Sequence, residues 1–247
     1  MSQYCNTGEI VSFFDNKTVA LVGPANNLIG KNKGKLIDSF DIVARLNDSY
    51  IIDEHQYADY GSRCDVLLNT CNCELLCIIK RFSNYLNGCK FIINPTSKVH
   101  GADFVNTKKN VYENFLDIDL DIPFYQVEEP FSSLMQKKNL NTGMCAISFL
   151  HSLNIDLNIF GFSFHGLNND KYKIDSSHVA SYETYLFDYK KVYTCKTNCP
   201  PSSPCRIRKD PRYATVAAES HQLNFFKESF LNKDNIVIDD TIINELK

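Results

Sequence analysis

The residues best suited to ligand chemistry lie near the start of the chain, where a glycine ends an apolar run in the stretch VALVGPANN. Because Gly23 follows this run, the turn after it offers free backbone N–H groups that a phosphate can approach. The turn matches neither the G-x-G-x-x-G pattern of dinucleotide sites nor the G-x-x-x-x-G-K-[ST] loop of triphosphate sites. It therefore indicates a phosphate ligand of another kind, or simply the first strand of an α/β domain.

Arg45 and Asn47 are two candidate ligand-binding residues in the next apolar run, which reads DIVARLN over residues 41–47. A buried arginine is costly unless it is paired, so Arg45 either contacts a ligand or forms an internal salt bridge with Asp38 or Asp65. Asn47 ends the run at the edge where ligands bind. Its amide can donate to a phosphate or to a base.

A third candidate is the tripeptide Asn141-Thr142-Gly143, which opens a helical pattern over residues 142–153. Thr142 can cap this helix, and a helix N-terminus favours negative charge. Gly143 has no side chain and lets a ligand approach the backbone. The same tripeptide is also an ordinary way to start a helix.

These residues must be positioned by apolar runs of strand type, which occur at residues 18–23, 41–47, 64–69, 89–94, 157–164 and 235–240. Segments with helix spacing, at 74–86 and 142–153, lie between some of these runs. Near-continuous apolar strands that alternate with helices predict a mostly parallel sheet with helices on both faces. We therefore predict one Rossmann-like α/β domain over residues 1–247, since the chain is short for two domains.

Composition and charge narrow the partners and the compartment. Lys and Arg number 26 against 29 Asp and Glu, which is not the basic excess that nucleic-acid binding requires. No segment resembles a signal peptide or reaches the ~20 apolar residues of a membrane span, so we expect no integral membrane segment. The ten cysteines are scattered, and some, such as Cys89 and Cys145, lie within apolar patterns. This usage favours reduced thiols and a cytoplasmic location.

Three segments resemble motifs of the family 29 sialyltransferases. The stretch at 19–47 resembles the large sialylmotif, YGSRCDVLLN at 60–69 resembles the segment that follows it, and the stretch at 140–164 resembles the small sialylmotif. The three matches occur in the family's order. The resemblance implies the GT-A-like fold variant of sialyltransferases. It also implies that sialic acid is transferred from CMP-sialic acid to a glycan hydroxyl, with inversion and without a metal or other cofactor.

By this resemblance, the glycine turn holds the single phosphate and the ribose of a CMP-sugar. Asn27 takes the place of the second Asn of the family's turn and should bind the phosphate. The positions that we expect to bind the donor are Gly23, Asn27, Arg45, Asn47, Asn141, Thr142, Gly143, Gly161 and Phe162.

Transfer requires a base for the acceptor hydroxyl, and histidine titrates near neutral pH. The family's base belongs to a C-terminal motif, commonly H-x4-E. His221 has the expected place before a closing helix, although Phe226 replaces the Glu, whereas His178 in HVASYE satisfies the pattern as written. We take His221 as the base and His178 as the residue that contacts the leaving phosphate. The fallbacks for His178 are Tyr172, Tyr182 and Tyr185.

The sequence also departs from the family. Val19 and Leu153 occupy the places of a disulfide that animal members carry, and Pro24 replaces the first Asn of the turn. The missing bridge and the absence of an N-terminal anchor favour a cytosolic enzyme of bacterial or viral type, although an excised catalytic domain would also lack the anchor.

The segment 194–213 has no counterpart in the family, and we expect a mobile loop whose basic residues serve an anionic acceptor or the donor's carboxylate. Its cysteines at 195, 199 and 205 can alternatively be read as zinc ligands, but their spacing is not that of a paired C-x-x-C site. Two other functions also stay open: transfer of another CMP-activated acid sugar such as Kdo, and CMP binding without catalysis.

Overall fold

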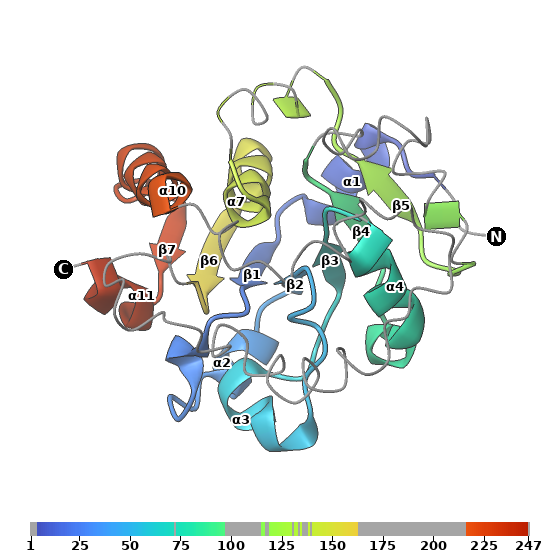
Figure 1. The fold of residues 1–247 in the computed structure, drawn as a ribbon, viewed down its shortest axis with the longest axis horizontal. Coiled ribbons are helices and arrows are strands. Elements are labelled where there is room, and N and C mark those ends of the chain that lie inside the picture. The colour runs from blue at the N-terminus through green and yellow to red at the C-terminus, as the bar shows by residue number, and fades with distance from the viewer. Residues whose placement is uncertain are drawn as a thin grey trace.

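The described residues form a seven-stranded sheet in which each strand pairs with its neighbours in parallel (Figure 1). The computed structural model describes residues 4–71, 73–96, 115–116, 119–129, 131–132, 134, 138, 140–162 and 216–246. The strands are β1 (Thr18–Val22), β2 (Ile42–Leu46), β3 (Val66–Leu68), β4 (Phe91–Asn94), β5 (Phe124–Gln126), β6 (Asp156–Phe160) and β7 (Ile236–Ile238). Their order across the sheet is β5-β4-β3-β2-β1-β6-β7. The predicted Rossmann-like α/β class is confirmed.

Helices cover both faces of this sheet. They are α1 (Thr7–Phe14), α2 (Gly34–Asp38), α3 (Tyr57–Tyr60), α4 (Cys73–Arg81), α7 (Thr142–Ser152), α10 (Val216–Ser229) and α11 (Asp240–Leu246). Short 3-10 turns are η1 (Asn26–Leu28), η2 (Glu54–Gln56) and η3 (Ser83–Leu86). Helices α1, α7 and α10 share one hydrophobic cluster, while α2, α3 and α4 pack on the opposite face (Figure 1). Because both faces are covered, the strands are apolar at nearly every position.

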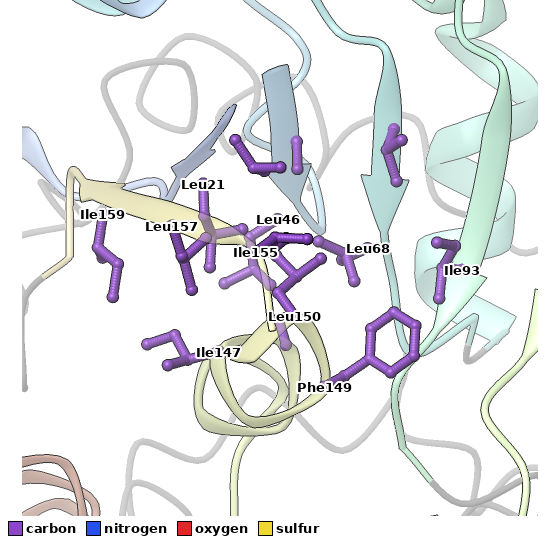
Figure 2. Packing of buried hydrophobic residues seen from close by; sticks show 14 of the residues in the cluster. Leu21, Leu46, Leu68, Ile93, Ile147, Phe149, Leu150, Ile155, Leu157 and Ile159 are labelled. Carbon is purple, nitrogen blue, oxygen red and sulfur yellow. The ribbon is translucent and has the colours of Figure 1, made fainter. Parts of the chain in front are cut away.

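The central packing element is α7, which is buried from Gly143 to Leu150. Figure 2 shows α7 side chains against those of the sheet: Ile147, Phe149 and Leu150 lie beside Leu21, Leu46, Leu68, Ile93, Ile155, Leu157 and Ile159. Burial of one such side chain contributes roughly 1.5–3 kcal/mol. The amino end of α7 is therefore held against the sheet by the hydrophobic core.

The predicted strand runs each contain an observed strand, with two instructive differences. The run expected over 157–164 ends as a strand at Phe160 because Gly161 has a positive φ of 62°, which breaks the extended conformation. The edge strand β5 was not predicted, since Pro123 precedes it and Gln126 ends it, so that no apolar run marks it. On its outer side, β5 forms one parallel bridge, between Phe124 and Tyr4.

The segment that follows the glycine turn packs through a close contact between α2 and α3. A Cβ built on Gly34 would overlap the carbonyl oxygen of Tyr57 and lie 2.8 Å from that of Ala58. Beside this contact, the Asp38 carboxylate accepts hydrogen bonds from the N–H of Ser62 (2.8 Å) and the N–H of Arg63 (3.1 Å). Residues 34–38 therefore pack closely against residues 57–63 and hydrogen-bond to them.

We expect Gly34→Ala to destabilise the protein by roughly 3 kcal/mol, because backbone atoms of α3 cannot yield to the added methyl group. The measurement is the urea midpoint of unfolding. Lys35→Ala, at the exposed neighbouring position, is the control and should change stability by no more than about 0.5 kcal/mol. Equal midpoints for the two variants would contradict the close packing of α2 on α3.

Candidate functional site

The direction in which successive strands are added to the sheet reverses between β1 and β6. From β1 the chain builds β2 to β5 on one side and then returns to place β6 on the other side. Ligands of open α/β sheets bind outside the carboxyl ends of the strands at such a point. Gly23 follows β1 there, and Gly161 and Phe162 follow β6. The structure thus brings the predicted glycine turn and the end of the small-motif segment to one place.

The two turns touch backbone to backbone. The N–H of Gly23 donates to the carbonyl of Phe160 (2.9 Å), and the N–H of Ala25 donates to that of Gly161 (2.8 Å). A Cβ on Gly23 would lie 2.5 Å from the Gly161 oxygen, and one on Gly161 would lie 2.7 Å from the Gly23 oxygen. Both positions must be glycine for this close approach.

Phe162 connects these turns to the amino end of α7. A Cβ on Gly143 would lie 3.0 Å from Cε1 of the buried Phe162 ring, and one on Gly23 would lie 2.8 Å from its Cδ2. Gly143 was expected to admit a ligand to the backbone. The group nearest to it is instead the phenyl ring, so packing alone accounts for the glycine.

Asn27 bridges the turn and the end of β6 through its side chain. Its Nδ2 donates to the carbonyl of Phe162 at 2.9 Å. Because a carbonyl only accepts, this bond fixes which end of the amide is nitrogen. Oδ1 is buried and has no hydrogen-bond partner among the described residues. A ligand hydroxyl or amine would satisfy Oδ1, while the second N–H of Nδ2 can donate to a phosphate.

Asn47 lies directly after β2 in the left-handed region, with a φ of 51°. Its backbone N–H donates to the carbonyl of Leu68 at 2.8 Å. Its side-chain Oδ1 is buried without a partner in the part of the chain that the structure describes. Asn47 therefore has the position at the carboxyl edge that the sequence predicted.

Asn47 is the first of a row of side-chain amides across the carboxyl edge of the sheet, which was not predicted. By the strand register, the next members are Asn69, Asn94 and Gln126, at the ends of β3, β4 and β5. Asn69 Nδ2 donates to the Asn47 carbonyl (3.3 Å), and Asn94 Nδ2 donates to Gln126 Oε1 (2.9 Å). The signal was visible in the sequence, since three strand runs end in Asn. Amides of this row hydrogen-bond to one another along the carboxyl edge of the sheet.

Asn141, rather than the expected Thr142, caps α7. Its Oδ1 accepts from the N–H of Met144 at 2.9 Å, and Thr142 is the first helical residue. Among the described residues, no partner is found for the N–H groups of Thr142 and Gly143. These two donors remain available at the end of the helix that favours negative charge.

His221 lies within α10, not before a closing helix as predicted, because α10 already begins at Val216. The side chain is exposed, and its Nε2 lies 2.7 Å from the carbonyl oxygen of Lys138. Since this oxygen only accepts, the hydrogen bond requires the proton on Nε2, and in the neutral ring the lone pair is then on Nδ1. Phe226, at the place of the expected Glu, is fully buried.

The structure places Arg45 inside the protein, not at the ligand edge. It is fully buried, and burial lowers the pKa of its guanidinium. Its hydrogen bonds go to three backbone carbonyls: Nε donates to Arg63 (2.6 Å), and Nη2 donates to Tyr60 (2.9 Å) and Gly61 (3.1 Å). Asp65, one of the two expected salt-bridge partners, pairs with Arg63 instead at 2.7 Å. Arg45 therefore has a structural role.

A lysine near the carboxyl end of β7 is also engaged internally. Lys33 Nζ lies 2.9 Å from Asp239 Oδ2 and 3.0 Å from Asp240 Oδ1. These hydrogen bonds raise the pKa of Lys33, and Lys33 lowers that of Asp240. Lys33 therefore already has two carboxylate partners at this edge.

The predicted site residues thus separate into groups. In direct contact are Gly23, Asn27, Gly143, Gly161 and Phe162. Asn47 is at the same edge, and Arg45 is not. His178, the three fallback tyrosines, the segment 194–213 and its three cysteines lie outside the described residues.

A scan against protein-family models finds no match, and a search of curated proteins finds none either. Among the described residues, no cluster of three or more His, Cys, Asp or Glu side chains is arranged to hold a metal. In the same part of the chain, no helix has the length and apolarity that crossing a membrane requires.

We expect Asn27→Ala to lower the free energy of unfolding by about 1 kcal/mol, the net contribution of one hydrogen bond, since it removes the bond to Phe162. Chemical denaturation measures this change. Asn84→Ala, at an exposed position, is the control and should have almost no effect. Unchanged stability in Asn27→Ala would show that its amide does not link the two turns.

Proposed function

We propose that the protein is an inverting, metal-independent glycosyltransferase that moves sialic acid from CMP-sialic acid to a glycan hydroxyl. The supporting observation is the contact between segments far apart in the sequence that resemble the large and small sialylmotifs. Gly23 of the first touches Gly161 and Phe162 of the second, and Asn27 donates a hydrogen bond to Phe162. Their meeting point lies where ligands bind to open α/β sheets.

The donors at this point suit a ligand with one phosphate. The N–H groups of Thr142 and Gly143 are unpaired among the described residues, and Asn27 can donate through one further N–H. Arg45 is buried and bound to backbone carbonyls, and Lys33 is paired with Asp239 and Asp240, so neither is free to neutralise a triphosphate. Neutral donors at a helix N-terminus match a single phosphodiester, as in a CMP-sugar.

In the proposed reaction, a glycan hydroxyl attacks the anomeric carbon of sialic acid while the bond from that carbon to the CMP phosphate breaks. The hydroxyl proton passes to Nδ1 of His221, which the bond between Nε2 and Lys138 leaves as the basic nitrogen. The phosphate leaves with the bonding electrons, and the donors at the amino end of α7 stabilise its charge.

A second candidate is a CMP-binding protein without transferase activity. It is favoured by Phe226, which occupies the place of the expected Glu and is fully buried in the core. Turnover of CMP-sialic acid, including hydrolysis to CMP, separates the two functions. A parallel assay with CMP-Kdo distinguishes sialic acid from the other acid sugar that the motif resemblance allows.

We expect CMP to raise the melting temperature, while ATP and NAD at equal concentration do not. Binding to the folded state adds RT ln(1 + [L]/Kd), about 2.7 kcal/mol at 100 times Kd. Thermal denaturation with each nucleotide measures the effect, and Asn27→Ala should reduce the CMP shift. An equal shift with ATP would contradict a site built for one phosphate.

We expect His221→Ala to lower kcat for sialyl transfer by ~10²–10⁴-fold, the usual contribution of a positioned base. The CMP-induced thermal shift should remain, and the acidic limb of the pH profile of kcat/KM should disappear. His55→Ala, which alters another exposed histidine, is the control and should retain activity. If the limb persists in His221→Ala and vanishes in His178→Ala, the base is His178.

A further inference from the structure

Three side chains on one side of α10 hold the segment that leads into α7. His221 Nε2 lies 2.7 Å from the Lys138 carbonyl, and the Lys138 Nζ lies 4.8 Å from the centre of the Phe225 ring. Gln222 Oε1 accepts from the backbone N–H of Asn141 at 3.0 Å. Helix α10 therefore contacts the segment before α7 at two residues, Lys138 and Asn141, which are three positions apart in the sequence.

Gln222 is an unusual residue for its position. It is 5% exposed and is followed along α10 by the buried Leu223, Phe226 and Phe230. A buried amide is unfavourable unless it is hydrogen-bonded, and an apolar side chain would pack at least as well. The hydrogen bond from the N–H of Asn141 explains why an amide, and not an apolar side chain, is present at this position.

The bond also limits where the Lys138 carbonyl can lie, because Lys138 is only three residues from Asn141 in the sequence. Asn141 is anchored on one side by its cap of Met144 within the buried helix α7, and on the other side by Gln222. Lys138 is three residues before this anchor, and its carbonyl selects the tautomer of His221. An error of about 1 Å in the position of a catalytic group can cost 10²-fold in rate.

We propose that Gln222 is a positioning residue for His221: by anchoring Asn141 it holds the Lys138 carbonyl that orients the imidazole and leaves Nδ1 as the basic nitrogen. This inference rests on the proposed role of His221 as the base. It assigns to α10 both the base and the residue that keeps the base aligned.

The test compares Gln222→Met, which keeps the volume but lacks an acceptor, with Gln222→Glu, which keeps an acceptor at the same distance along the side chain. Asn224→Met, on the exposed side of α10, is the matched control. The first readout is the ¹⁵N NMR pattern of the His221 ring in its neutral form. The signal is assigned as the one of the chain's six histidines that is lost in His221→Gln.

In the wild type, Gln222→Glu and Asn224→Met, we expect a protonated Nε2 and an unprotonated Nδ1. In Gln222→Met both nitrogens should shift toward intermediate values, because neither tautomer is then selected. The second readout is kinetic. Gln222→Met should lower kcat by about 10- to 100-fold while KM for the CMP-sugar stays nearly constant, the pattern of a lost transition-state interaction.

A wild-type ring pattern in Gln222→Met would overturn the inference, as would an equal loss of kcat in Gln222→Met and Gln222→Glu. If Gln222→Met does not fold, Gln222→Asn replaces it, since the shorter side chain takes the acceptor out of reach. Absence of any transfer by the wild type would contradict the proposed function, and the NMR comparison would still decide whether Gln222 orients His221.

Discussion

The burial of one positive charge constrains the half of the molecule that carries the glycine turn. Arg45 is fully buried in β2, and its guanidinium binds the carbonyl of Tyr60 at the end of α3 and those of Gly61 and Arg63 in the loop before β3. Losing this loop would leave a buried charge without partners, so the loop can adopt few other conformations. Tyr60 also restricts the glycine turn, because its hydroxyl donates a hydrogen bond to the carbonyl of Ala25 in that turn at 2.8 Å.

The rest of the connection between β1 and α2 is fixed by a carboxylate of the same region. Asp59 accepts from the N–H of Gly30 and from the N–H of Asn32, both at 2.8 Å. The next residue, Lys33, pairs with Asp239 after β7. A turn that would otherwise be a loose surface loop is thus held on both sides. Donors that are held in place before a ligand arrives lose less entropy on binding.

The sequence predicted what depends on local pattern and missed what depends on distant contacts. Apolar runs and helix spacing identify β1 and α7, because burial on one or both faces leaves a periodic signal. They do not identify β5, which Pro123 precedes and Gln126 ends, or the direction of the Arg45 side chain, which depends on carbonyls far along the chain. The helix start at Val216, five residues before His221, was also missed, although Thr215 directly before it is a residue type favoured at helix N-caps.

The same distinction applies to the motif resemblance. Some matching residues, such as Arg45 and Asp38, build the loop before β3, while others, such as Gly23 and Asn27, lie where the strands end. The first group would be required for any ligand at this edge, so its presence supports the architecture more than the substrate. The proposal of a CMP-sugar ligand rests on the second group. The proposed chemistry rests on His221, whose Nε2 lies against one backbone carbonyl. Function in this fold is therefore decided by few residues on a framework that many residues specify.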